Sequence, residues 1–126
     1  MITPGFNLPA MYIIHTVGPM FPGARDPVYQ GEVNHDYGPL GPKVLLVSAF
    51  RSCLDIATTQ GFKSIVFPAI SCGVFGCPIS VCAKVARQLV VGLEWKPLEL
   101  IVFALYTPAE CVSFVETWKM LEPGSE

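Results

Sequence analysis

Residues 67–78 of the chain read Phe-Pro-Ala-Ile-Ser-Cys-Gly-Val-Phe-Gly-Cys-Pro. This stretch joins the short β-rich segment 64–67 to a segment with helical spacing, and it contains two glycines and little bulk. At such a junction the backbone N–H groups of the loop and of the first helical turn lack intrachain partners, and the helix dipole adds partial positive charge. The stretch therefore predicts a strand-to-helix loop that can hold an anion such as a phosphate.

A helix is predicted on each side of this loop. Residues 43–60 carry apolar side chains at helical spacing, and Gly61 follows in the position of a left-handed C-terminal cap. After Pro78, which suits a first helical turn, a second apolar stripe begins. That stripe consists of Cys82, Val85, Ala86, Leu89, Val90 and Leu93.

Two more strands and one more helix complete the predicted order. Residues 11–17 and 99–105 are β-rich runs. Residues 107–110 read Thr-Pro-Ala-Glu. The threonine is a capping residue, the proline takes the first helical position, and the glutamate follows two residues later. A capped helix is therefore predicted from Thr107 to Leu121. Alternating strands and helices predict parallel strands with right-handed crossovers, and thus an α/β layered domain.

Three junctions of this α/β arrangement fall at one edge of the predicted sheet. They are the glycine loop, the segment that starts at Gly18, and the turn formed by Tyr106 and Thr107. Ligands of parallel sheets bind beyond the carboxyl ends of the strands, so these junctions predict one cleft. Residues 18–42 contain five prolines and five glycines without a sustained period, and they are interpreted as a long loop of functional or mobile character. Within it, Asp26, Glu32, His35 and Asp36 are most simply solvated surface groups.

Composition predicts one domain spanning residues 1–126. Hydrophobic residues make up 52% and charged residues 14% of the chain, and the mean hydropathy is +0.50, which favours a sheet buried on both faces. The apolar runs are far shorter than the ~20 residues of a membrane span, so no membrane insertion is expected. The net charge of −2 offers no basic stripe, and strong nucleic-acid binding is not expected.

The start of the chain shows neither a charged region nor an apolar stretch typical of a secretory signal, which predicts an intracellular protein, cytoplasmic or nuclear. The five cysteines are an odd number. Cys53, Cys82 and Cys111 fall on apolar helix faces, which suits reduced core thiols better than a disulfide framework.

Cys72 and Cys77 raise two chemical alternatives. With Cys82 they form the spacing C-x4-C-x4-C, which is not a usual zinc pattern and has no histidine close in sequence, so no metal is expected. Cys72 at a helix N-terminus has the setting of a reactive thiol with a lowered pKa. A Cys–His pair with His15 or His35 would have to be made by the fold.

Gly73, Phe75 and Gly76 also have two interpretations each. The glycines alone are consistent with a tight turn, whereas the flanking sequence favours phosphate binding. Phe75 lies between the two glycines, where a large apolar side chain is difficult to explain as core. It is interpreted as a ligand contact, the alternatives being a lid over the loop or a contact with another chain.

The chain resembles the macrodomains, a family that binds ADP-ribose. The resemblance rests on residues 13–19, Ile-Ile-His-Thr-Val-Gly-Pro, on residues 67–78, and on the spacing of the helix between them, and it extends over residues 2–121. It implies a three-layer α/β/α fold with a largely parallel or mixed sheet. It also implies that the loop at residues 71–76 wraps the diphosphate with its backbone amides. No cofactor is expected.

The implied ADP-ribose site comprises Ser71, Cys72, Gly73, Val74, Phe75, Gly76, Tyr106 and Thr107. By this resemblance the ring of Phe75 packs on the distal ribose, and Tyr106 and Thr107 lie beside the adenine or its ribose. Members of the family carry, ahead of the region that matches Ile2, an aspartate that reads adenine, an asparagine-rich segment and a glycine-rich loop. The chain shows no counterpart of these, so we expect a macrodomain without its N-terminal strands and without the segment credited with catalysis.

The function expected from this resemblance is binding of ADP-ribose or of ADP-ribosylated proteins. One alternative is hydrolysis of mono-ADP-ribosyl protein or deacetylation of O-acetyl-ADP-ribose, if the N-terminal part is supplied; its catalytic residues are not identified. A second alternative is an inactive partial domain that acts as an interaction surface. Strands left without partners also predict self-association through an exposed sheet edge.

Overall fold

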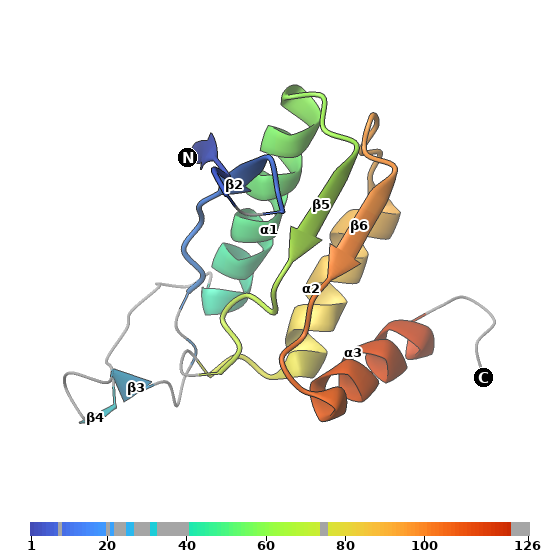
Figure 1. Cartoon of the computed structure of the whole chain (residues 1–126). Helices are drawn as coiled ribbons and strands as arrows, with labels where there is room; N and C mark the ends of the chain where they lie inside the picture. The colour runs from blue at the N-terminus through green and yellow to red at the C-terminus, as the bar shows by residue number, and fades with distance from the viewer. Residues whose placement is uncertain are drawn as a thin grey trace.

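The computed structural model describes residues 1–7, 9–19, 21, 25–26, 31–32, 41–73 and 76–121 (Figure 1). Strands and helices follow one another as β1 (Ile2–Pro4), β2 (Tyr12–Ile14), β3 (Arg25–Asp26), β4 (Gly31–Glu32), α1 (Gly41–Thr59), β5 (Ser64–Phe67), α2 (Ile79–Gly92), β6 (Leu100–Phe103) and α3 (Pro108–Met120). The predicted helices and the strands at 64–67 and 99–105 are confirmed, with small differences at their ends. In the described part of the chain, no helix combines the length and the apolar character needed to cross a membrane.

The strands pair in three separate ladders. β5 and β6 are parallel, with Phe67 opposite Phe103, as predicted. β2 pairs with β1 in antiparallel orientation, and β3 pairs with β4 in the same way. The prediction that residues 11–17 join a parallel sheet is therefore wrong for the described residues. The short connection between β1 and β2 explains this, because antiparallel neighbours need only a short link, whereas a parallel pair needs a crossover of a dozen or more residues.

The end of α1 is set by Gly61. This residue has φ +75°, its N–H donates to the Thr58 carbonyl at 3.1 Å, and the N–H of Phe62 donates to the Ala57 carbonyl at 2.9 Å. These two bonds form a Schellman motif, which uses carbonyls that the last helical turn would otherwise leave without partners. The predicted left-handed cap is confirmed.

The start of α3 confirms the predicted capping residue. The Thr107 hydroxyl accepts from the Glu110 N–H at 3.2 Å, and Pro108 occupies the first turn. The Glu110 carboxylate accepts from the N–H of Tyr106 at 3.3 Å, one residue before the cap. Both side chains thus supply acceptors for backbone N–H groups at this helix start.

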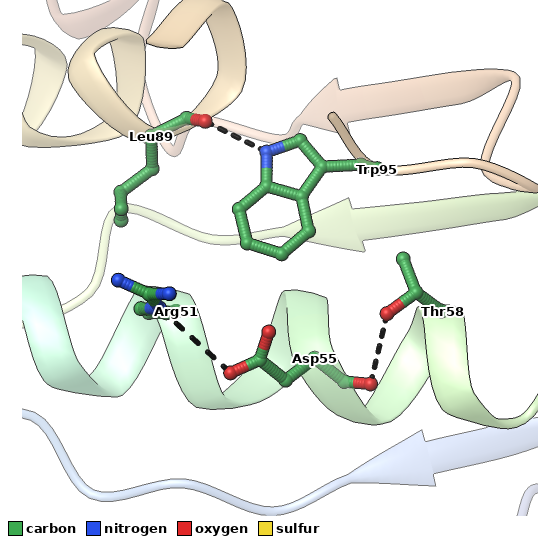
Figure 2. Close-up of polar contacts among 5 residues, drawn as sticks. All are labelled: Arg51, Asp55, Thr58, Leu89 and Trp95. Atoms are coloured by element: carbon green, nitrogen blue, oxygen red, sulfur yellow. Dashed lines mark hydrogen bonds and ion pairs between the residues drawn. The ribbon is translucent and has the colours of Figure 1, made fainter. Parts of the chain in front are cut away.

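Helix α2 begins one residue later than predicted. Pro78 lies before the first turn as its N-cap, with an extended backbone at φ −63° and ψ 143°. At the other end, the indole N–H of Trp95 donates to the Leu89 carbonyl at 2.7 Å (Figure 2). Figure 2 also shows the exposed Arg51–Asp55 ion pair on α1, a type of contact that adds little stability.

The core lies between the β5–β6 pair and the helices. Phe67 of β5 and Phe103 of β6 have ring centroids 5.7 Å apart. Phe103 also meets Phe114 of α3 at 5.0 Å, and Phe67 meets Phe50 of α1 at 5.2 Å. Helix α2 contributes fully buried side chains to the same cluster, among them Val85. Aromatic pairs at such distances stabilise beyond the apolar area that they bury.

The opposite face of this strand pair is exposed. Side chains alternate between the two faces of a strand, so Val66, Leu100 and Val102 point away from the core. Their exposed fractions are 62%, 56% and 38%. Within the described residues the β5–β6 pair is therefore buried on one face, in contrast to the two buried faces that composition predicts.

Truncation of neighbouring residues on β5 tests this assignment of faces. We expect Phe67→Ala to lower the free energy of unfolding by about 3–5 kcal/mol, because it removes a buried ring and leaves a cavity. Val66→Ala, its neighbour on the exposed face, is the matched control and should cost about 1 kcal/mol or less. Urea-induced unfolding of both variants measures the difference. Equal losses of unfolding free energy in the two variants would contradict the assignment of Phe67 to the buried face and Val66 to the exposed face.

Candidate functional site

The loop that follows β5 lies at the carboxyl end of the parallel strand pair. Figure 1 shows this loop and the connection from β6 to α3 at the same end of the two strands. The Ala104 N–H donates to the Phe67 carbonyl at 2.8 Å, which holds the two chain segments together just beyond the strands. The predicted convergence of the glycine loop with the turn of Tyr106 and Thr107 is confirmed.

Gly18 brings the third junction to the same place. A Cβ built on Gly18 would overlap the Ser71 hydroxyl and lie 2.6 Å from Cγ2 of Ile70. Only a residue without a side chain allows the backbone after β2 to approach the loop this closely. The backbone at Gly18 thus forms one wall beside Ser71.

The loop backbone adopts left-handed conformations at three described positions. Ser71 has φ 66°, Gly73 has φ 87° and Gly76 has φ 81°. Glycine takes such angles without steric cost, whereas Ser71 is a non-glycine residue held there by its surroundings. A Cβ added at Gly73 would meet no atom of the described residues within 4 Å, so the described part of the chain leaves the outer side of this residue open.

Hydrogen bonds inside the loop decide which amides remain for a ligand. The backbone N–H of Cys72 donates to the Ala69 carbonyl at 3.1 Å. The N–H of Gly76 donates to the Gly73 carbonyl, and the N–H of Cys77 donates to the Ser71 carbonyl, both at 3.0 Å. Among the described residues, the amides of Ser71 and Gly73 donate to no backbone carbonyl. Within the described part of residues 71–76, these two N–H groups are the ones left for an anion.

The hydroxyl of Ser71 is a polar group that sequence reasoning did not single out. The residue is only 7% exposed, and its Oγ has no hydrogen-bond partner among the described residues. A buried hydroxyl without a partner costs about 1–3 kcal/mol. Such a group is expected where a ligand supplies the partner, and the hydroxyl and the two amides belong to residues 71–73 of the loop.

Residues 67–78 contain no lysine or arginine. An anion at this loop would therefore be held by backbone dipoles and a hydroxyl group rather than by a charged side chain of the loop. Such dipoles attract an anion most strongly where water is excluded.

The thiols of Cys77 and Cys82 lie near Cys72, and the Cys77 thiol donates to the Pro78 carbonyl at 3.4 Å. Hydrogen bonds from Cys77 and Cys82 lower the pKa of Cys72 to about 4, although its partial burial acts in the opposite direction. The hydrogen bond to Cys72, followed by burial, raises the pKa of both Cys77 and Cys82. The lowered pKa predicted for Cys72 is confirmed, but its cause is different. Helix α2 begins only at Ile79, and the neighbouring thiols produce the shift.

The two histidines do not complete a described Cys–His pair. His15 shares a hydrogen bond of 2.7 Å with the Thr3 hydroxyl through its Nε2, on the exposed β1–β2 unit. His35 lies outside the described residues. The expectation that Cys111 belongs to the core is wrong, because this thiol is exposed on α3, whereas Cys53 and Cys82 are buried as predicted.

Several predicted contacts remain predictions. Val74 and Phe75 lie outside the described residues, as do Asp36 and the chain end after residue 121. Tyr106 is 93% exposed beside the loop end of β6, free to contact a ligand. The Thr107 hydroxyl is already used as the cap of α3, so a ligand would meet its methyl group or backbone instead.

A surface depression of about 710 Å³ lies elsewhere, between the end of α2 and the start of β6. It is lined by residues 90–96 and 98–101, at the amino end of β6 and thus at the opposite end from the loop. The Trp95 indole N–H that borders it is already bonded to the Leu89 carbonyl. The candidate site therefore rests on the loop after β5 and not on this depression.

A family model described as the Macro domain matches residues 1–86. The chain belongs to the Macro domain family. This confirms the resemblance found in residues 13–19 and 67–78 and the α/β fold expected from it.

Relatives of this Macro domain chain include curated proteins and solved structures. A Streptomyces griseus protein named "Macro domain-containing protein in non 5'region" is 35% identical over 114 residues, covering 90% of this chain and 56% of that protein. An O-acetyl-ADP-ribose deacetylase of Escherichia fergusonii is 43% identical over 90 residues, covering 71% and 43%. The structure of the Oceanobacillus iheyensis macrodomain with ADP superposes with a TM-score of 0.77 at 30% identity, covering 96% and 57%.

The chain spans about half the length of these relatives. The expectation that it is a macrodomain without its N-terminal strands stays a prediction.

The lowered pKa of Cys72 predicts how this thiol reacts as the pH changes. Because a thiolate persists above its pKa, we expect iodoacetamide to label Cys72 at nearly the same rate between pH 6 and pH 8. Labelling of an unstructured peptide with one cysteine, whose pKa is about 8.5, should rise steeply over that range. Peptide mass spectrometry after short labelling pulses measures both rates. A Cys72 rate that rises in parallel with the peptide would contradict the thiol network.

Proposed function

We propose that this chain binds ADP-ribose, free or attached to protein, with the diphosphate at the loop of residues 71–76. The observation that carries this proposal is the set of unused donors within residues 71–73, namely the amides of Ser71 and Gly73 and the buried hydroxyl of Ser71. A diphosphate supplies several acceptor oxygens at the spacing of neighbouring backbone amides. Hydrogen bonds to a charged group contribute about 1.5–3 kcal/mol each, more than bonds to a neutral one.

The shape of the site agrees with a dinucleotide-like ligand. The open space outside Gly73 admits the phosphates, and the exposed ring of Tyr106 offers an apolar surface at the same end of the sheet. We assign the adenine or its ribose to the turn of Tyr106 and Thr107, and the distal ribose to Phe75. The relatives support this choice of ligand, since one was solved with ADP and another is named for O-acetyl-ADP-ribose.

Enzymatic activity is the second candidate, and the name of the Escherichia fergusonii relative favours it. Deacetylation or removal of ADP-ribose from a protein requires a positioned water molecule and a group that activates it. We assign no residue of the described loop to that step. Binding is therefore the primary proposal for this chain.

An interaction surface is the third candidate, and the exposed face of β5 and β6 favours it. Val66, Leu100 and Val102 place apolar side chains next to strand edges, an arrangement that promotes association between chains. Self-association through this edge is compatible with ligand binding at the loop.

Calorimetric titration with ADP-ribose, AMP and inorganic phosphate tests the proposed ligand. We expect ADP-ribose to bind more tightly than AMP, because the site is arranged for a diphosphate and a second ribose. Equal affinities for ADP-ribose and AMP would leave the distal part of the site unused, and no heat from any of the three would refute binding. A parallel assay for release of ADP-ribose from a modified protein separates a binder from a hydrolase.

Substitution of Gly73 tests the position of the diphosphate. We expect Gly73→Val to abolish ADP-ribose binding, because the branched side chain fills the open space outside the loop. Gly61→Val is the matched control, since Gly61 also has a left-handed backbone and open surroundings but lies at the end of α1. Both variants carry a backbone strain of about 1–3 kcal/mol, so their melting temperatures should fall together. Unchanged affinity in Gly73→Val would disprove the assignment.

Removal of the Ser71 hydroxyl should change stability and affinity in opposite directions. We expect Ser71→Ala to raise the free energy of unfolding of the ligand-free protein by about 1 kcal/mol, because a buried hydroxyl without a partner is lost. The same change should weaken ADP-ribose binding about tenfold through the loss of one bond to a phosphate oxygen. Ser52→Ala, on the exposed surface of α1, should alter neither quantity. A variant that binds as tightly as the wild type would place the hydroxyl outside the site.

A further inference from the structure

The binding proposed above uses backbone amides and the Ser71 hydroxyl, and it leaves the sulfur atoms at the same loop without a role. The thiols of Cys77 and Cys82 are the groups that act most strongly on Cys72, so three sulfur atoms lie near one another around the start of α2. The Cys77 thiol donates to the Pro78 carbonyl at 3.4 Å. Cys53 of α1 and Cys111 of α3 are not among the groups that act on Cys72. All five cysteines are free thiols.

We propose that Cys72 and Cys77 form a reversible disulfide when the protein meets a peroxide, so that the loop carries a thiol oxidation site. Cys72 and Cys77 differ in exposure and therefore have different roles in the oxidation. Cys72 is half-buried and open to small oxidants, whereas Cys77 is only 5% exposed and lies directly beside it. Cys72 is thus the thiol that a peroxide reaches, and Cys77 is the thiol that resolves the product.

The loop backbone holds these two residues next to each other. The Cys77 N–H donates to the Ser71 carbonyl at 3.0 Å, and that carbonyl carbon is bonded directly to the nitrogen of Cys72. A disulfide requires such neighbouring backbones, because it joins residues whose α-carbons are only about 4.4–6.8 Å apart. Cys82 is fully buried and fixed within α2, where its N–H donates to the Pro78 carbonyl at 3.2 Å. Cys77 is therefore the favoured partner.

The oxidation proceeds in two balanced steps. The Cys72 thiolate attacks one oxygen of hydrogen peroxide, an S–O bond forms as the O–O bond breaks, and the hydroxide that leaves takes up a proton to become water. The Cys77 sulfur then attacks the Cys72 sulfur, the S–S bond forms as the S–O bond breaks, and a second water leaves with the Cys77 proton. Two thiols lose two electrons in total, and the peroxide is reduced to water. The low pKa of Cys72 supports the first step, because the thiolate is the reactive form.

The disulfide should also change the affinity for ADP-ribose, a consequence that rests on the proposed function. A Cys72–Cys77 bond closes a ring that contains Gly73 and Gly76, the two left-handed glycines of the loop. We expect ADP-ribose affinity to fall about tenfold on oxidation, the effect of displacing roughly one bond to a charged group.

Mass spectrometry of the full chain tests the disulfide itself. The reduced protein is treated with hydrogen peroxide and then alkylated with N-ethylmaleimide, and we expect two fewer labelled thiols than the five of the reduced chain. Chymotrypsin cleaves after Phe75, between the two cysteines, so the linked peptides should separate only after reduction. Five labelled thiols after oxidation, a Cys72–Cys82 link, or links between chains would each overturn the proposal.

Two variants complete the test. Cys77→Ser should block the link and leave Cys72 as a sulfenic acid that dimedone traps, whereas Cys111→Ser, on the exposed surface of α3, should oxidise as the wild type does. Mapping of the disulfide in the wild-type protein does not depend on whether Cys77→Ser folds.

Titration of the reduced and oxidised protein with ADP-ribose separates the two proposals. Absence of binding by the reduced protein refutes the proposed function alone, and a protein that binds but forms no disulfide refutes the oxidation site alone.

Discussion

The parallel register of β5 against β6, with Phe67 opposite Phe103, is the constraint on which the candidate site depends. Because the strands are parallel, both end at one edge, and the connections to α2 and α3 start from that edge side by side (Figure 1). The rings of Phe67 and Phe103, packed with Phe114 of α3, fix this register, since a slip of either strand by one residue would turn its ring to the opposite face of the sheet. Core packing thus determines where the loop begins.

Ser71 carries several energetically unfavourable features at once. It combines a left-handed backbone, a buried hydroxyl without a described partner and the close approach of Gly18. Strain and unused polar groups of this kind persist only where the surrounding structure compensates for them, and they are typical of functional sites. Here the compensation comes from the hydrogen bond between Cys77 and Ser71 and from the adjoining core. The loop is therefore arranged in advance, and a ligand would gain the bonds without a large reordering cost.

Local signals made much of this fold predictable from the sequence, and long-range contacts made the rest unpredictable. Gly61 and Thr107 act within one helical turn, so their caps can be read from the neighbouring residues. β1 is three residues long and ends in proline, so its strand character depends on β2 and leaves little local signal. Likewise, the exposure of Cys111 and the unused hydroxyl of Ser71 depend on which segments the fold brings together. The candidate loop could be predicted because its glycines and its family resemblance are both local in sequence.

The β1–β2 ladder is separate from the β5–β6 pair, so the two parts are expected to open at different free energies. Among the described residues this hairpin shares no ladder with β5 and β6, and it contacts the rest through side chains such as Tyr12, whose ring stacks on Phe62 at 5.1 Å. A unit joined in this way opens at a lower free energy than the core, and its amides exchange with solvent independently of global unfolding. The chain runs from β2 directly to Gly18, the wall beside Ser71. The wall beside Ser71 thus continues directly from the separate β1–β2 unit rather than from the aromatic core.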